Sequence, residues 1–426
     1  MKYKQRIADI LLANKLRGVG AVLIEGAKWC GKTTTAEQLA KSVVYLDNPQ
    51  DRSNNLQMAQ INPGMLLKGE TPRLIDEWQL APELWDAVRF EVDHRDNDGQ
   101  FILTGSVTPM SNEDEQKIFH SGAGRITRLR MRPMTLWESK DSNGQVSLGD
   151  IFANKNNIVG VCDKELSDIA WLICRGGWPR AIEQDKETAL GRAFDYFDTV
   201  VHVDIKQPDR IERNPERVKL LMRSYARNQG SPVSLTALCA DMKANDSDTL
   251  DDRTVYSYLN ALKSIFVVED CKAWNPNIRS KAAIRTSDTR YFTDPSIAVA
   301  SLGIGPDDLL SDLNTMGLFF ETLCMRDLRV YAQVLDGDVY HYRDSDGLEC
   351  DAVVHLRNGA YGLIEIKLGG ESAIEEGALT LLKLGKKLDT DKMKSPSFSM
   401  VLTAVGSFAY QREDGVFVVP IGCLKP

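Results

Sequence analysis

The stretch Gly26-Ala27-Lys28-Trp29-Cys30-Gly31-Lys32-Thr33 has the complete G-x-x-x-x-G-K-[ST] pattern of a phosphate-binding loop. The apolar run at residues 21–24 predicts a short buried strand before it, and residues 34–42 predict a helix after it, with Leu39 on its apolar face. Glycines in such a loop let successive backbone N–H groups point at phosphate oxygens. Lys32 is expected to reach the β and γ phosphates, and the Thr33 hydroxyl to ligate magnesium. We therefore predict that residues 26–34, Thr34 included, bind a nucleoside triphosphate.

A second motif, Leu74-Ile75-Asp76-Glu77, is the end of an apolar strand followed by two acids. In a nucleotide site, Asp76 would hold magnesium through water and Glu77 would polarise the water that attacks the γ phosphate. The alternative is an ordinary acidic pair on a solvated surface. The motif therefore suggests hydrolysis in addition to binding.

A third apolar run, at residues 100–106, ends in the small polar residues Thr104 and Ser106. Strands of a parallel sheet that are buried on both faces read as continuous apolar runs, and functional groups gather at their carboxyl ends. Thr104 or Ser106 is thus the expected sensor of the γ phosphate. Three such strands predict one doubly wound α/β sheet.

Four stretches, taken in order, resemble the AAA+ superfamily: residues 26–33, 74–79, 103–106 and 123–125. They are similar to a group of prokaryotic ATP-binding proteins that carries a characteristic C-terminal domain of unknown function. Gly176-Gly177-Trp178-Pro179-Arg180 and the segment around Asp351 and Glu365 look like later landmarks of that group. The resemblance implies an AAA+ ATPase with ATP and Mg²⁺ as cofactors, assembled as a homo-oligomer, a ring such as a hexamer. Pro72 and Arg73 depart from the pattern and shorten the strand before Asp76.

Two arginines are candidates for further roles that this resemblance implies. Arg125 would be an arginine finger that reaches the γ phosphate of a neighbouring subunit, a role that raises the rate by about three orders of magnitude or more. Alternatively, Arg125 is an exposed residue at the start of a strand whose Arg128, Arg130 and Arg132 share a solvated face. Arg180, in the Gly-Gly-Trp-Pro-Arg turn, is a candidate second sensor.

Composition limits the class of protein. With 426 residues, 43% of them hydrophobic, the chain can form several domains with ample cores. No apolar segment approaches the ~18 residues of a membrane span, and the N-terminus predicts an amphipathic helix at residues 7–16, so we expect a cytoplasmic protein. The net charge of −8 argues against wholesale coating of nucleic acid, so any DNA contact must be local. The eight cysteines lack metal-ligand spacing and read as reduced thiols; Cys30, inside the loop, is either an oxidation switch or a tolerated variable position.

We expect four domains: an AAA+ nucleotide-binding domain (1–147), a helical lid (148–205), a winged helix-turn-helix (206–300) and a PD-(D/E)XK nuclease-like domain (301–426). The third rests on three predicted helices, at residues 218–226, 234–242 and 252–262, followed by two strand-like stretches. Thr254, Tyr256 and Ser257 would begin the helix that reads the DNA groove. The wing would contact phosphates through its basic residues, which are Arg279, Lys281, Arg285 and Arg290. Winged helices also serve as protein-interaction or purely structural modules.

The last domain holds a second constellation of charged residues. Glu321 lies on a mostly apolar predicted helix, Asp351 on a strand, and Glu365 and Lys367 on one face of the next strand, because strand side chains alternate. The three carboxylates could ligate magnesium, and Lys367 could orient a hydrolytic water. The arrangement resembles a PD-(D/E)XK nuclease core. Such cores are also kept as inactive binding modules.

Two functions follow from these features. In the first, ATP hydrolysis drives a machine that binds or processes DNA. In the second, the nucleotide state switches a protein-interaction scaffold whose nuclease-like tail is inactive. Both require the ATP site.

Overall fold

The computed structural model describes residues 3–95, 97–108, 121–154, 158–244, 251–276, 287–388 and 394–426. The chain forms two compact units. The first unit comprises Met1–Pro133, His202–Asn214 and Tyr258–Val267, and the second comprises Met134–Val201, Pro215–Ser257 and Val268–Pro426. The second unit therefore contains segments from all three of the domains that we expected after residue 147, and two short segments from the middle of the chain return to the first unit.

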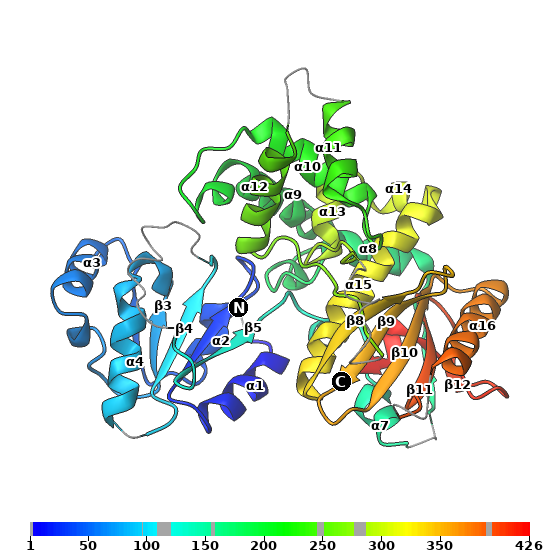
Figure 1. Cartoon of the computed structure of the whole chain (residues 1–426), viewed down its shortest axis with the longest axis horizontal. Coiled ribbons are helices and arrows are strands. Elements are labelled where there is room, and N and C mark those ends of the chain that lie inside the picture. The colour runs from blue at the N-terminus through cyan, green and yellow to red at the C-terminus, as the bar shows by residue number, and fades with distance from the viewer. Residues whose placement is uncertain are drawn as a thin grey trace. The chain divides into compact units, whose positions relative to one another are not determined.

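The first unit is built on a five-stranded sheet in the order β2-β3-β4-β1-β5 (Figure 1). All of its neighbouring strands are parallel. The strands are β1 (Ala21–Glu25), β2 (Ser42–Tyr45), β3 (Arg73–Asp76), β4 (Phe101–Gly105) and β5 (Ile126–Arg130). The predicted doubly wound sheet is confirmed, and β3 is short, as Pro72 and Arg73 suggested.

Alternating side chains of these strands form a core on each face of the sheet. Leu23, Ile75 and Leu103 pack with α3 (Arg52–Ile61) and α4 (Glu83–Arg95) on one face. Val22, Leu74 and Ile102 pack with α1 (Ile7–Leu16) and α2 (Lys32–Glu37) on the other. Short 3₁₀ turns complete the unit at Pro63–Met65, Trp78–Leu80 and Asp204–Lys206.

The helix after the phosphate loop is shorter than predicted. We expected it to extend to residue 42, but α2 ends at Glu37, and Ser42 already begins β2. The β-branched pair Val43 and Val44 favours a strand, and Val44 is buried in the sheet. A strand therefore takes residues that the helical pattern had claimed.

The second unit begins with helices. Its first helices are α6 (Leu136–Ser139), α7 (Leu148–Phe152), α8 (Leu166–Arg175), α9 (Lys186–His202), α10 (Pro215–Arg227), α11 (Leu235–Lys243) and α12 (Asp252–Ser264). The last residues of α9 and α12 belong to the first unit. Ser234 caps α11 by accepting a hydrogen bond from the Ala237 amide, as the sequence suggested. After α12, two isolated antiparallel bridges join Val268 to Phe292 and Cys271 to Thr289.

The C-terminal part contains a seven-stranded mixed sheet in the order β7-β12-β13-β11-β10-β9-β8. Its strands are β7 (Gly160–Val161), β8 (Gly337–Arg343), β9 (Glu349–Leu356), β10 (Tyr361–Lys367), β11 (Phe398–Thr403), β12 (Phe408–Gln411) and β13 (Phe417–Pro420). Strands β8, β9 and β10 are antiparallel, whereas β10 and β11 are parallel. The chain crosses between the last two through α16 (Glu371–Lys387). The remaining helices are α13 (Pro295–Leu302), α14 (Pro306–Ser311) and α15 (Leu313–Val334), with 3₁₀ turns at Ala181–Glu183 and Ile421–Cys423. The small parallel pair is β6 (Val146–Ser147) and β14 (Leu424–Lys425).

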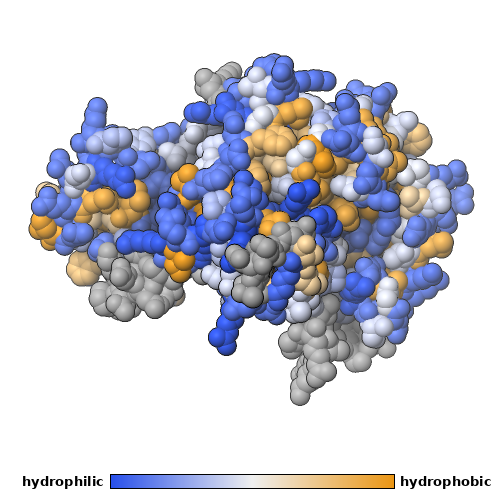
Figure 2. Space-filling view, turned by 90° about the horizontal axis from the view of Figure 1, so that it is seen from above, coloured by the Kyte–Doolittle hydropathy of each residue, from blue (hydrophilic) through white to orange (hydrophobic). Residues whose placement is uncertain are grey.

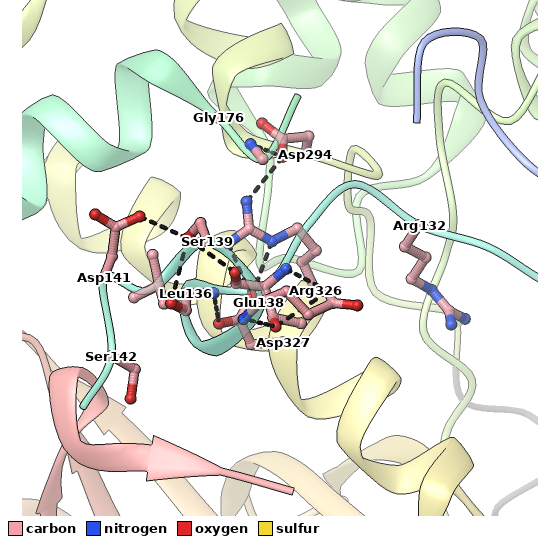
Figure 3. A network of polar contacts seen from close by, with 12 residues as sticks. Arg132, Leu136, Glu138, Ser139, Asp141, Ser142, Gly176, Asp294, Arg326 and Asp327 are labelled. Atoms are coloured by element: carbon pink, nitrogen blue, oxygen red, sulfur yellow. Dashed lines mark hydrogen bonds and ion pairs between the residues drawn. The ribbon is translucent and has the colours of Figure 1, made fainter. Parts of the chain in front are cut away.

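A buried ionic network holds the helical part of the second unit together (Figure 3). Arg326 on α15 bonds Asp294 at 2.9 Å and Asp327 at 2.8 Å, and all three side chains are almost completely buried. Asp294 also accepts from the Gly177 amide, and Asp327 from the Leu136 amide. A Cβ atom on Gly177 would lie 2.2 Å from a backbone oxygen of Met134, so only glycine fits there. The Gly-Gly-Trp-Pro turn is therefore an anchored part of the core.

The surface alternates hydrophilic regions with apolar patches on the face drawn in Figure 2. Within the described ranges, every helix is too short or too polar to span a lipid bilayer.

Candidate functional site

The phosphate loop follows the carboxyl end of β1 in the first unit. Gly31 has a φ of 99° and Trp29 a φ of 65°, so the loop turns back through left-handed conformations before α2. A Cβ atom on Gly26 would lie 2.0 Å from the Met131 oxygen, which explains the first glycine of the motif. Lys32 is 5% exposed, and its Nζ donates to the carbonyls of Gly26 and Ala27 at 3.0 and 2.9 Å. The loop therefore holds the positive charge of Lys32 against its own backbone carbonyls.

Three predicted residues converge directly beside the loop. The Thr33 hydroxyl donates to Asp76 Oδ1 at 2.7 Å, and the Thr104 hydroxyl donates to the same oxygen at 2.6 Å. Burial raises the pKa of Asp76, and the two hydroxyl bonds oppose that rise. A carboxylate with two hydroxyl donors is well ordered. The two bonds therefore fix the position of the Asp76 carboxylate, and its role as a magnesium ligand stays a prediction.

Glu77 follows in the left-handed region with a φ of 57°, which is unusual for a residue with a side chain. Its amide donates to Thr104 Oγ1 at 3.1 Å, and its Oε2 accepts from Ser106 Oγ at 3.0 Å and from Gln79 Nε2. The Ser106 bond holds the Glu77 carboxylate at the carboxyl end of β4. The strand that carries Thr104 and Ser106 lies between β1 and β3, so it can contact both the loop and the acids.

Two further residues of the first unit contact the loop, and the motifs did not indicate either. Arg6, which is 4% exposed, donates to the carbonyls of Cys30 and Arg132 at 2.7 and 2.8 Å. Asp204 accepts from Lys28 Nζ at 2.6 Å. Both lie far from the loop in sequence and outside any recognisable pattern.

Arg125 lies at the opposite edge of the parallel sheet from the phosphate loop. Its carbonyl accepts from the amide of Ala21, the first residue of β1, so the length of a five-residue strand, about 16 Å, separates it from the loop of its own chain. Its side chain is 45% exposed and bonds Asp93 at 2.7 Å, which lowers the pKa of Asp93. Any catalytic action of Arg125 must therefore be directed at another subunit.

Other predicted residues of this site are placed as follows. Thr34 is exposed on α2, Cys30 is buried inside the loop, and Arg180 is exposed in the second unit, where its role as a sensor stays a prediction. The expected solvated face of Arg128, Arg130 and Arg132 is wrong in part. Arg132 is 9% exposed, and Arg130 stacks on Phe266 with its guanidinium 4.0 Å from the ring centroid. Phe266 belongs to the Tyr258–Val267 segment of this unit, so this segment covers Arg130.

The second constellation lies in the mixed sheet. Asp351 on β9 precedes Ala352, which pairs with Ile364 on β10, and the Ile366 amide donates to Asp351 Oδ2 at 2.7 Å. Glu365 and Lys367 lie on one face of β10 and form an ion pair of 2.9 Å. Glu321 on α15 accepts from the Tyr291 hydroxyl. The order of elements is an acid-bearing helix, three antiparallel strands, a crossover helix and a parallel strand.

The charges of this cluster are strongly interdependent. Burial and then Asp351 raise the pKa of Glu321, and burial and then Asp351 also raise that of Glu365. Burial alone would lower the pKa of Lys367, but Glu365 and Asp351 raise it. Lys367 therefore leans toward a carboxylate, as expected without a metal. Among the residues that the structure describes, no group of three carboxylate, imidazole or thiol side chains is arranged to hold a metal ion. The magnesium site that we expected from Glu321, Asp351 and Glu365 stays a prediction.

The predicted DNA-contacting residues have mixed surroundings. On α12, Tyr256 is 54% exposed, and Thr254 and Ser257 are half-buried. The neighbouring Arg253, which was not among the predicted contacts, is also exposed. Arg290 does not face solvent as expected, because it forms a 2.5 Å ion pair with Asp270 and is 11% exposed. Arg279, Lys281 and Arg285 lie outside the described residues.

Comparison with known proteins agrees with the geometry of the first unit. Residues 19–140 match the AAA domain family, and residues 166–308 and 316–424 match two domains of unknown function, DUF8612 and DUF4143. Uncharacterized proteins of Mycobacterium bovis and Mycobacterium tuberculosis are 24% identical over 378 residues, which is 86% of this chain and 74% of each relative.

Two solved structures show distant likeness. One is the Walker-type ATPase PABY2304 of Pyrococcus abyssi, at 13% identity and a TM-score of 0.42, covering 70% of this chain and 96% of that one. The other is the ORC2 protein of Aeropyrum pernix in its ADP form, at 13% identity and a TM-score of 0.30, covering 63% and 88%.

The AAA match covers the phosphate loop, the acidic pair and the polar residues of β4. Together with the parallel sheet, it identifies the α/β domain of the first unit as a P-loop ATPase domain of the AAA type.

Proposed function

We propose that this protein hydrolyses ATP with magnesium and couples hydrolysis to the binding or processing of DNA. The observation that carries the proposal is that the two neighbouring acids, Asp76 and Glu77, have different hydrogen-bond partners. Asp76 is held by the hydroxyls of Thr33 and Thr104, whereas Glu77 is held by Ser106 and Gln79. One acid is thus arranged as a metal-side ligand and the other as a base.

The residues beside the loop fit a magnesium ion. A hydroxyl and a carboxylate 2.7 Å apart, next to a loop made for phosphate, are the hard oxygen donors that Mg²⁺ takes together with phosphate oxygens. Thr33 would contact the ion directly and Asp76 through water. When bound, the ion would neutralise part of the negative charge of the phosphates.

The chain's own groups would perform the remaining steps. Glu77 would accept the proton of the attacking water, and Ser106 and Gln79 would orient its carboxylate. Lys32 would exchange the carbonyls of Gly26 and Ala27 for phosphate oxygens and stabilise their charge. Thr104 ties the two acids together, because its hydroxyl bonds both Asp76 and the Glu77 amide.

Exposure of α12 supports the DNA part of the proposal. Arg253 and Tyr256 offer a cation and an aromatic ring on one short stretch of helix, a combination that suits phosphate and base contacts. The order of elements around Asp351, Glu365 and Lys367 is also consistent with a nuclease-like core.

A nucleotide-switched protein scaffold is the second candidate. Two observations favour it: the pairing of Arg290 with Asp270, and the lack of a metal-holding group of three ligands among the described residues. In this case the C-terminal domain would be an inactive binding module.

One experiment separates these candidates. ATP turnover is measured alone, with duplex DNA and with single-stranded DNA, at low salt. Stimulation by DNA supports the first function, and turnover indifferent to DNA supports the second. Magnesium- or manganese-dependent cleavage that is lost in Asp351→Ala and Lys367→Ala, while ATP turnover stays intact, would assign nuclease activity to the C-terminal domain.

A further inference from the structure

The segment His202–Asn214, which we call the strap, brings a buried carboxylate to the phosphate loop. The chain leaves the second unit after Val201, joins the first unit along the strap and returns at Pro215. Within the first unit, Asp204 Oδ1 accepts from Lys28 Nζ at 2.6 Å and from Gln207 Nε2 at 2.9 Å. Lys28 belongs to the loop, so the strap is attached to the part of the chain that would wrap the phosphates.

Asp204 also lies within electrostatic range of the catalytic groups. Its side chain is 4% exposed, and burial raises its pKa, with Lys28 opposing. Glu77 and Lys32 also influence its charge. Glu77 is the group that would face the water attacking the γ phosphate. The Lys28 ion pair therefore places the negative charge of Asp204 beside the loop that would receive the phosphates of a nucleotide.

The strap is anchored, so this contact is a built feature of the domain. Arg213, whose side chain is 1% exposed, bonds both carboxylate oxygens of Asp209, at 2.8 and 2.6 Å, and donates to the Ile205 carbonyl at 3.1 Å. Its guanidinium also lies over the Tyr258 ring, 5.7 Å from the centroid. These bonds fix the part of the strap that follows Asp204.

A carboxylate in this place opposes the binding of a polyphosphate. Like charges in a buried site repel, and an ammonium held by a carboxylate is less available to a phosphate oxygen. The Lys28 ammonium group therefore bonds either the Asp204 carboxylate or a phosphate oxygen of the nucleotide. Which partner Lys28 bonds should depend on the number of phosphates, because ATP brings more negative charge to the loop than ADP does.

We propose that Asp204 is a positioning residue of the nucleotide site, which holds Lys28 until the terminal phosphate of ATP takes it over. The transfer loosens the strap in the ATP state and restores it in the ADP state. The strap is covalently continuous with α9 and α10, so its release is a signal that the second unit can receive. This inference rests on the proposed ATPase function and adds a sensor to it.

A thermodynamic cycle tests the exchange of Lys28. The full-length protein and the variants Asp204→Asn, Lys28→Ala and the double variant are titrated with Mg-ADP and with a non-hydrolysable Mg-ATP analogue. Asp204→Asn should bind the ATP analogue about tenfold more tightly, the effect of one charged contact, and ADP with little change. Lys28→Ala should weaken binding of the analogue more in the Asp204→Asn background than in the wild type, because Lys28 then has no second partner to lose.

Glu212→Gln is the matched control, because it removes one carboxylate from the strap at a position whose side chain is 81% exposed. It should leave both affinities unchanged. Effects of Asp204→Asn and Lys28→Ala that simply add, or equal changes for both nucleotides, would overturn the inference while leaving the ATPase function intact. Loss of nucleotide binding by the wild type would overturn both.

A second measurement needs no variant. Amide hydrogen exchange of residues 203–213 in the wild type should be faster with the ATP analogue than with ADP. Exchange that is identical in the two states would contradict a released strap even if Asp204→Asn fails to fold.

Discussion

The Thr104 hydroxyl is the residue on which the geometry of the site depends most. It donates to the Asp76 carboxylate and accepts from the Glu77 amide. It therefore provides a hydrogen-bond partner both for Asp76 and for the backbone at Glu77, which has a positive φ. It is completely buried. A γ-phosphate sensor in this position would also set the directions of both carboxylates.

Ser106→Ala is the residue-scale test of how Glu77 is oriented. The change removes one hydrogen bond to Glu77 Oε2 and leaves Gln79 in place. We expect kcat for ATP hydrolysis to fall by about tenfold, with the affinity for Mg-ATP unchanged, because only the alignment of the base is lost. Steady-state kinetics and titration of a non-hydrolysable analogue measure the two quantities. An unchanged kcat would remove Ser106 from the mechanism.

Sequence analysis could find these residues because each lies in a short motif at the carboxyl end of a strand. Lys32, Asp76, Glu77, Thr104 and Ser106 meet because parallel strands end at one edge. Arg6 and Asp204 could not be found in this way. They reach the loop through tertiary packing over long separations, and a lone arginine or aspartate carries no signature.

At the scale of one element, α15 combines two tasks. It carries Glu321 toward the mixed sheet and, one turn and a half later, Arg326 and Asp327 toward the helical core. Buried charges on one helix require compensation along its whole length. The stability of this helix therefore depends on its ion pairs.

Arg326→Met should destabilise the second unit. It leaves Asp294 and Asp327, both with fully buried side chains, without their cation, at an expected loss of about 3–5 kcal/mol in the free energy of unfolding. Arg357→Met is the matched control, since its ion pair with Asp336 is 79% and 69% exposed and should contribute about 0–1 kcal/mol. Urea denaturation measures both. Equal losses would show that the network is not essential to the core.

The pH dependence of stability gives a second test of this helix. Burial raises the pKa of Asp327 from its ordinary 3.8 to about 6, although Arg326 opposes the rise. A carboxyl with a raised folded-state pKa contributes stability below its unfolded pKa and loses it as pH rises through the folded value. The unfolding free energy of the wild type, relative to that of Asp327→Asn, should therefore decrease as the pH rises from about 4 to about 7. A constant difference would place the pKa of Asp327 near its ordinary value.

Element boundaries were predictable for α1 from its hydrophobic pattern and for α11 from its pattern together with the capping Ser234. The prediction for α2 failed because the β-branched pair at the end of the pattern joined the sheet. Where we predicted two strands of a wing, the structure has two isolated bridges. Pairing partners so far apart in sequence are set by tertiary structure, which local pattern does not contain.

At the scale of the whole molecule, variants of Arg125 test whether the protein acts as an oligomer. Its distance from the loop of its own chain limits any finger role to a neighbouring subunit, and the Asp93 contact would have to open first. Specific ATPase activity should rise with protein concentration. Mixing Arg125→Ala with Lys32→Ala should restore part of the activity, because each supplies what the other lacks. Concentration-independent turnover by a species that light scattering shows to be monomeric would refute the role.

DNA binding, if it drives the ATPase, should rely on phosphate contacts, since the chain as a whole is acidic. Affinity should fall steeply with salt, and Arg253→Ala, at an exposed position, should reduce the slope of the logarithmic plot by about one. Arg290→Ala should instead lower stability, because it breaks a buried pair with Asp270. Binding that does not change with salt would support the scaffold function.

The most direct test of the central claim is ATP turnover by the wild type, Lys32→Ala and Glu77→Gln, measured as phosphate release beside nucleotide binding. The wild type should hydrolyse ATP in the presence of Mg²⁺. Lys32→Ala should lose binding, because the cation that faces the phosphates is gone. Glu77→Gln should bind ATP as the wild type does and turn it over about 10²–10⁴ times more slowly, because an amide cannot accept the proton. Similar turnover by all three proteins would contradict the assignment of the ATP site.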